Sequence, residues 1–141
     1  MEVTIYIATT LKDPRRGPGR YGYVIECMKD GKPVTREGFG GHEDTTESAL
    51  TLQAIAEALE KLTRPCMVKI LTSCSAVKVG IGKGWVYEWQ KAGWKTQKGS
   101  EVKNAEIWQR VLKAASTHMI SIPEEPNPYE AWIESEMAKR E

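Results

Sequence analysis

The chain has 141 residues, of which 40% are hydrophobic and 28% are charged, and its formal net charge is only +1. This length and composition are those of one ordinary globular domain that buries about two thirds of its unfolded surface, so we expect a single domain over residues 1–141. No apolar run approaches the roughly 20 residues that a membrane-spanning helix needs, which excludes that class of protein.

The near-neutral total conceals an uneven distribution of charge. Cations gather in the loop Lys12–Arg20 and between Lys83 and Arg110, whereas acidic residues gather in His42–Glu60 and Glu124–Glu141. A basic zone on a neutral chain still binds phosphate, but weakly and in a salt-sensitive way.

The cysteines bear on the cellular compartment. Cys27, Cys66 and Cys74 are odd in number and lack CxxC spacing, which favours reduced thiols over a disulfide scaffold. The N-terminus leads straight into a predicted strand, so we expect no signal peptide and a cytoplasmic location.

The N-terminal part of the chain predicts three antiparallel strands. Apolar and polar side chains alternate from Val3 to Ala8, which indicates a strand, and a loop punctuated by glycine and proline runs from Leu11 to Arg20. A second strand over about Tyr21 to Met28 and a third over Val34 to Gly40 are joined by the tight-turn sequence Asp30-Gly31.

Helical patterns begin after the third strand. Asp44 and Glu47 have capping-box spacing, and apolar residues then recur at helical period over Leu52–Leu62, so one face of this helix is core. The short β-rich run Met67–Leu71 predicts a buried parallel strand.

The remaining residues predict four helices and one more strand. Ser75–Ile81 and Trp85–Ala92 have the pattern of short helices, and Gly93 follows the second in the usual C-terminal position. The other expected elements are a helix capped by Asn104, a strand at Met119–Ile122 and a last helix from Asn127-Pro128 through Met137. The order βββ-αβ-ααα-βα predicts a mixed sheet with helices packed on it.

One segment carries a specific resemblance. Residues 84–110, here called the basic segment, read GWVYEWQKAGWKTQKGSEVKNAEIWQR and contain GWK, VKN and WQR in register. This segment resembles the basic protrusion of bacterial type 1 ribonuclease H, and the order of elements resembles that family over nearly the whole chain. The resemblance implies the α/β ribonuclease H-like fold, a mixed five-stranded sheet of three antiparallel and then parallel strands flanked by helices.

The same resemblance implies that the metal-binding carboxylates of the family are absent from this chain. The family holds two Mg²⁺ ions with four carboxylates, because hard cations need oxygen ligands. Those positions are occupied here by Ala8 in IYIATT, Thr51 in SALTLQAIAEALEKL, Cys74 in LTSCS and, at or near the fourth position, Ser135. The loop Pro123–Pro126 also lacks the histidine that the family usually keeps. The resemblance therefore implies a domain that binds no metal or other cofactor and catalyses no hydrolysis.

Other chemistry at these positions has weaker support. Cys74 acts as a nucleophile only if His42 or His118 activates it, and a zinc site with a histidine lacks ligand spacing. A cysteine at a strand end is more often a small packing residue, and we expect Thr51 to bond its own helix.

The basic segment is the first predicted contact surface for nucleic acid. In the enzymes that it resembles, the protrusion contacts the DNA strand of an RNA/DNA hybrid. Trp85 and Trp89 share one helical face, and we expect most of the tryptophan rings to pack the protrusion onto the core. The residues assigned to phosphates and sugars are Trp85, Lys91, Lys95, Lys98 and Lys103.

The loop after the first strand is the second predicted surface. In the family it meets the minor groove, so Arg15 and Arg16 are assigned to bidentate phosphate contacts. Thr45 and Thr46 precede the first long helix, near the place where the family binds a phosphate of the DNA strand.

Three functions stay open at this point. The first is a hydrolytically inactive domain that binds RNA/DNA hybrid or another duplex. The second is a protein-interaction or homodimerisation module that no longer binds nucleic acid, and the third is an active ribonuclease H with an atypical site.

Overall fold

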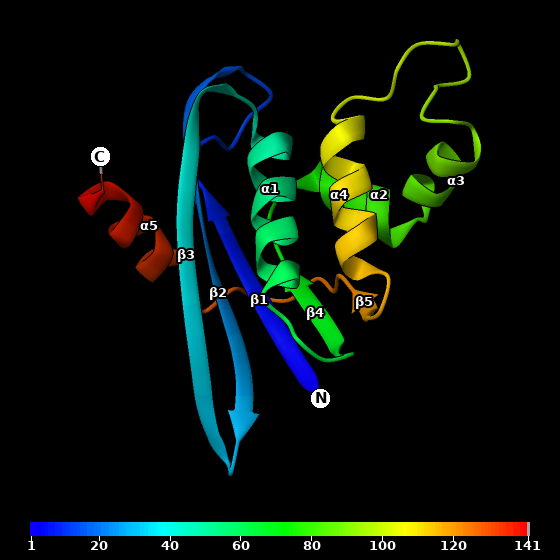
Figure 1. Cartoon of the computed structure of the whole chain (residues 1–141). Coiled ribbons are helices and arrows are strands. Elements are labelled where there is room, and N and C mark those ends of the chain that lie inside the picture. The colour runs from blue at the N-terminus through cyan, green and yellow to red at the C-terminus, as the bar shows by residue number, and fades with distance from the viewer. Residues whose placement is uncertain (141) are drawn as a thin grey trace.

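The computed structural model describes residues 1–140; only Glu141, the last residue of the expected domain, lies outside them. The centre of the fold is one five-stranded sheet in the order β3-β2-β1-β4-β5 (Figure 1). β2 is antiparallel to both of its neighbours, β1 and β3, whereas β4 and β5 run parallel to β1. The strands are β1 Glu2–Thr9, β2 Gly17–Lys29, β3 Lys32–Thr45, β4 Met67–Leu71 and β5 Met119–Ser121.

Helices cover both faces of this sheet. Figure 1 shows α1 and α4 on one face and α5 on the other, with α2 and α3 beyond α4. The helices are α1 Glu47–Glu60, α2 Ser75–Gly82, α3 Trp85–Lys91, α4 Ala105–Ala115 and α5 Glu130–Lys139. The predicted mixed sheet with flanking helices is therefore confirmed.

Alternation along the strands divides the core in two. In β1, Ile5 and Ile7 belong to the larger apolar cluster beneath α1, whereas Tyr6 and Ala8 belong to a smaller cluster beneath α5. Successive side chains of a strand point to opposite faces, so one strand supplies both clusters.

The β2–β3 hairpin is longer than the sequence predicted. Its turn is as expected, because Asp30 and Gly31 both have positive φ, 54° and 77°. At the other end β2 begins at Gly17 and β3 continues to Thr45, so the prediction of a loop up to Arg20 was wrong. Gly17 pairs with Thr45 through a β-bulge, and glycine in such a bulge gives the same sequence signal as glycine in a loop.

A second correction concerns the start of α1. The N-cap is Thr46, whose side chain accepts a hydrogen bond from the backbone N–H of Ala49 at 3.2 Å. Asp44 still lies in β3, so the predicted capping box of Asp44 and Glu47 was wrong. Because β3 stays paired with β2 as far as Thr45, the helix begins after Asp44. The spacing of residues in the sequence does not reveal where this strand pairing ends.

Two further observations concern membrane-spanning helices and the cysteines. The structure contains no helix, within residues 1–140, that is long and apolar enough to cross a membrane. Cys27, Cys66 and Cys74 are all described, and all three are free thiols.

Candidate functional site

Three of the four positions that the sequence resemblance assigns to carboxylates, Ala8, Thr51 and Cys74, are buried. Ala8 is 4% exposed and packs in the cluster beneath α5 with Val24, Leu71 and Ile133. Its methyl group offers no ligand atom, and apolar side chains surround it.

Thr51 and Cys74 are buried on the opposite side of the sheet. The Thr51 hydroxyl donates to the Glu47 carbonyl one turn earlier at 2.8 Å, as the sequence predicted. Cys74 is 2% exposed within the core cluster beneath α1, and its Sγ lies 3.7 Å from Ser48 Oγ. Thr51 therefore bonds within its own helix, and Cys74 contacts that helix through Ser48.

The fourth position behaves differently. Ser135 is exposed on α5 and does not lie with the other three in a buried site. Between α5 and the loop after β1, the Lys12 ammonium lies 3.8 Å from a Glu130 oxygen and 3.6 Å from a Glu134 oxygen. An amino group therefore joins these two elements at the end of the sheet.

The remaining carboxylates near this end do not replace the missing set. Burial raises the pKa of Glu47 above its usual value, the Lys12 charge opposes this shift, and the Asp13 charge adds to it. Among residues 1–140, no three His, Cys, Asp or Glu side chains come together in a group that could hold a metal ion. The residues present therefore do not fit the metal pair of the family.

Neither histidine is arranged to activate Cys74. The His42 Nε2 atom lies 2.7 Å from the Gln53 side-chain oxygen, and His118 Nδ1 accepts a hydrogen bond from the backbone N–H of Cys66 at 3.0 Å. Each histidine ring is thus bonded to another residue, and within residues 1–140 the Cys74 thiol lies in the core cluster beneath α1.

The basic segment forms α3, a loop and the first turns of α4, and Figure 1 shows α3 and the loop standing clear of the sheet. Trp108 is 4% exposed, and its ring lies edge-on to Trp89 at 5.8 Å between centroids, while Trp89 in turn meets Trp85 at 6.5 Å. Trp94 also packs against the core cluster, so three rings anchor the segment, and Trp85, 48% exposed, is the outermost of the row that runs from Trp108 through Trp89. Asn104 is the N-cap residue of α4 as predicted, but its side chain makes no capping bond.

The lysines of this segment are free to meet a ligand. All are exposed, and none makes an ion pair with another of the residues 1–140. The set is Lys91, Lys95, Lys98 and Lys103.

The arginines assigned in the loop after β1 are already paired. Arg15 forks onto the Asp13 carboxylate, with its closest contact at 2.8 Å, and Arg16 binds the Asp44 carboxylate at 2.6 Å. Thr45 is buried, and the Thr46 hydroxyl is occupied as the helix cap. Arg20, which the sequence did not single out, has no ion-pair partner among the described residues.

Sequence reasoning also missed the polar clamp that holds α5. Glu26 on β2 accepts hydrogen bonds from Tyr6 at 3.0 Å and from Tyr129 at 2.5 Å, and the two rings lie 4.7 Å apart. The Asn127 amide adds a bond to the Ile7 carbonyl at 3.2 Å. These residues are far apart in the chain, and no local pattern connects them.

Comparison with known proteins places this architecture. A sequence model described as RNase H matches residues 2–123, a range that ends before α5. The chain is 44% identical over 105 residues to "Ribonuclease H" of Methylococcus capsulatus, covering 74% of this chain and 64% of that relative. It is 40% identical over 120 residues to "Ribonuclease H" of Cupriavidus metallidurans, covering 85% and 79%. The chain thus spans slightly less than two thirds of the first relative.

Solved structures agree. LC9-RNase H1, described as a type 1 RNase H with the type 2 active-site motif, superposes with a TM-score of 0.72 at 25% identity, covering 85% of this chain and 60% of that one. LC11-RNase H1, solved in complex with RNA/DNA hybrid, has a TM-score of 0.61 at 16% identity, covering 94% and 93%, which bears on the fold alone. The sheet order, the matched range and the relatives together show that this chain belongs to the RNase H family.

Proposed function

We propose that this chain is an RNase H-like domain that binds RNA/DNA hybrid, or a duplex of similar shape, without metal-dependent hydrolysis. The observation that carries the proposal is the burial of Ala8, Thr51 and Cys74, at 4%, 1% and 2% exposure. Magnesium keeps its water shell unless charged oxygens replace it, and these side chains offer a methyl group, a hydroxyl turned to its own helix and a thiol.

Binding rests on the basic segment. Its four unpaired lysines can each neutralise a phosphate and release a counterion, which favours association with any nucleic-acid backbone. Trp85, half exposed beside them, offers an aromatic surface of the kind that lies along sugars or bases. Hybrid is the preferred ligand because the family relatives are ribonucleases H and LC11-RNase H1 was solved with such a hybrid.

The compartment and partners belong to the same proposal. Three free thiols support a reducing location such as the cytoplasm. A protein partner or a homodimer is the alternative if nucleic acid is not bound, and light scattering of the free chain separates monomer from dimer.

One experiment tests both halves. Hybrid binding is measured by fluorescence anisotropy at two salt concentrations, and cleavage is followed with Mg²⁺ or Mn²⁺. We expect binding that weakens steeply with salt, and no cleavage. Metal-dependent cleavage that disappears on changing Thr51 or Cys74 would establish an active enzyme with an atypical site. Absence of binding even at low salt would favour the protein-interaction module.

A further inference from the structure

Arg15 and Arg16, in the loop after β1, and Arg20, near the start of β2, are in different electrostatic states. Arg15 and Arg16 are each joined to an aspartate, whereas the guanidinium of Arg20 has neither an ion pair nor a hydrogen bond among residues 1–140. The backbone of Arg20 is nevertheless fixed. Its N–H donates to Thr10 Oγ1 at 2.9 Å, and its carbonyl accepts from the Thr10 N–H at 3.0 Å. An unpaired cation is thus presented from a rigid position.

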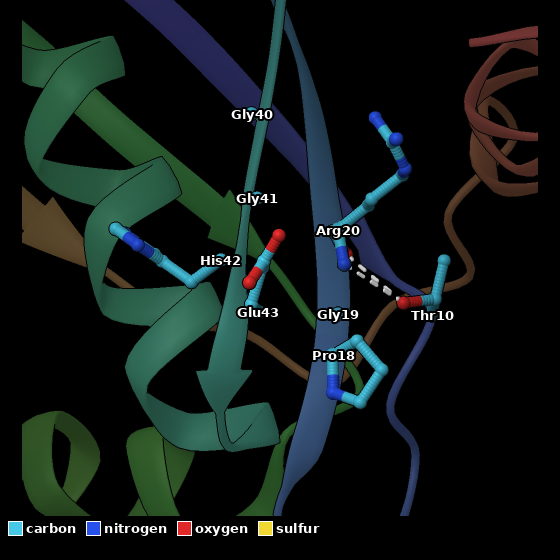
Figure 2. A pocket seen from close by; sticks show the side chains of 8 residues that line it. All are labelled: Thr10, Pro18, Gly19, Arg20, Gly40, Gly41, His42 and Glu43. Atoms are coloured by element: carbon cyan, nitrogen blue, oxygen red, sulfur yellow. Dashed lines mark hydrogen bonds between the residues drawn. The ribbon is translucent and has the colours of Figure 1, made fainter. Parts of the chain in front are cut away.

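Arg20 lines a cleft of about 450 Å³ that crosses the β2–β3 pair. Figure 2 shows the Arg20 side chain extending from one side of this pair and His42 from the other, toward α1. Beside Arg20 the surface is backbone, because a Cβ at Gly41 would lie 2.6 Å from the Gly19 carbonyl oxygen and 3.1 Å from the Arg20 side chain. β3 is also an edge strand, so the backbone groups on its outer side have no partner strand.

We infer that this cleft binds a phosphodiester of a nucleic-acid strand, with the Arg20 guanidinium as its principal ligand. A guanidinium forks onto two phosphate oxygens, and the concave edge of a sheet adds backbone N–H donors. The glycine floor lets the phosphate approach closely, and the bonds to Thr10 reduce the freedom that Arg20 loses on binding.

The cleft lies at the same end of the molecule as the basic segment, so it enlarges the proposed binding surface for nucleic acid. The inference rests on that proposed function. In Figure 1 the loop after β1 and the loop after α3 lie at the same end of the molecule, with the start of α1 between them. A duplex lying over the start of α1 meets the lysines of the basic segment on one side and Arg20 on the other. Glu43 also lines the cleft, and its charge opposes a phosphate there.

The test compares charge-matched variants in hybrid binding at low salt. Arg20→Gln should weaken affinity by about tenfold and reduce the log–log salt slope by about 1, because the glutamine no longer neutralises a phosphate. Arg20→Lys keeps the charge but loses the two-oxygen contact, so its affinity should lie between those of Arg20→Gln and the wild type, and Glu43→Gln should increase affinity. The control is Lys32→Gln, which removes the same charge at the far tip of the hairpin and should change affinity by less than about twofold.

Two outcomes overturn the inference in different ways. If Arg20→Gln binds like Lys32→Gln while the wild-type chain binds hybrid, the cleft is not a phosphate site and the proposed function stands. If the wild-type chain binds no hybrid, both fail. If Arg20→Gln does not fold, NMR spectra of the wild-type chain are recorded with and without hybrid. The inference expects the amide signals of Gly19 and Gly41 to shift when hybrid is added. Unchanged signals would show that the inference is wrong.

Discussion

At the scale of single residues, two of the positions that the resemblance assigns to carboxylates are occupied by packing side chains. Ala8 and Cys74 each fill an apolar cluster, on opposite faces of the sheet, and both are nearly inaccessible to water. A carboxylate in either place loses its hydration without gaining a partner. Ser135, the remaining position on α5, is exposed and free of this constraint.

Restoring aspartate at these positions tests that view of the site. Ala8→Asp and Cys74→Asp should each lower the free energy of unfolding by about 1–3 kcal/mol. Because the two clusters are distinct, the effects should add in the double variant. Ser135→Asp is the control and should change stability by less than about 0.5 kcal/mol. Urea unfolding measures all four variants, and an unchanged midpoint for Ala8→Asp would contradict the burial of this position.

Tyr6 predicts a dependence of stability on alkaline pH. Burial, and then its hydrogen bond to Glu26, raise the pKa of Tyr6 from 10.0 to about 12. The folded state therefore holds this proton more tightly than the unfolded state. The stabilisation is complete below pH 10 and is lost as the pH rises toward about 12. Urea midpoints at about pH 9 and about pH 11 should differ less for Tyr6→Phe than for the wild type, whereas the exposed Tyr87→Phe should keep the wild-type difference.

At the scale of elements, α5 covers its own face of the sheet, opposite α1 and α4 (Figure 1). It lies beyond the range that the family model matches, and it is held by one apolar face and a few polar contacts. Ile133 is fully buried in that face, against the backbone of Gly22. Trp132, its neighbour in sequence, is 42% exposed and meets Phe39 at 6.3 Å between ring centroids.

The apolar face of α5 gives a prediction for its anchoring. Ile133→Ala should destabilise the protein by about 2–4 kcal/mol, because it leaves a cavity beneath the helix. Trp132→Ala, which removes a larger but partly exposed side chain, should cost less. Thermal unfolding measures both variants. Equal destabilisation would mean that the outer face of α5 contributes as much as its buried face.

In the basic segment, Trp108 holds the segment on the core, whereas Trp85 is the tryptophan expected to contact nucleic acid. Trp108→Ala should destabilise the protein by about 3–5 kcal/mol, because this ring is buried in the core cluster. Trp85→Ala should leave stability nearly unchanged and weaken hybrid binding several-fold, since a stacked ring contributes about 1–3 kcal/mol per base. The two effects are measured by unfolding and by anisotropy. If Trp85→Ala binds hybrid with wild-type affinity, Trp85 does not contact the ligand and only the lysines of the basic segment bind it.

At the scale of the whole molecule, the net charge of +1 conceals a sorted surface. The four lysines of the basic segment and Arg20 make no ion pair within residues 1–140, whereas acidic residues such as Glu60, which binds Arg110 at 2.7 Å, are neutralised in pairs. Binding to a nucleic-acid backbone then depends on local charge and not on the total.

This sorting predicts binding that ignores base sequence. Two hybrids of equal length and unrelated sequence should bind with affinities within about threefold, because phosphate contacts carry no sequence information. Changing Lys91, Lys95 and Lys98 together to Gln should flatten the salt slope by about 1 for each phosphate that these lysines neutralise in the wild type. Anisotropy titrations over a salt series measure both, and a strong preference for one sequence would require base contacts that the proposal lacks.

The sequence by itself determined the order of the elements, the family, and the neutral residues at Ala8, Thr51 and Cys74. Periodicity and motifs depend on residues close together in the sequence, so they can be recognised without knowledge of the fold. Only the tertiary structure decided that Arg15 and Arg16 are engaged by aspartates while Arg20 is free, and that Glu26 clamps α5 through two tyrosines. It also decided the length of the β2–β3 hairpin and the start of α1. The Arg16, Tyr129 and hairpin contacts join residues distant in sequence, and the Arg15 pairing depends on how the loop folds, so these features follow from chain geometry and not from local pattern.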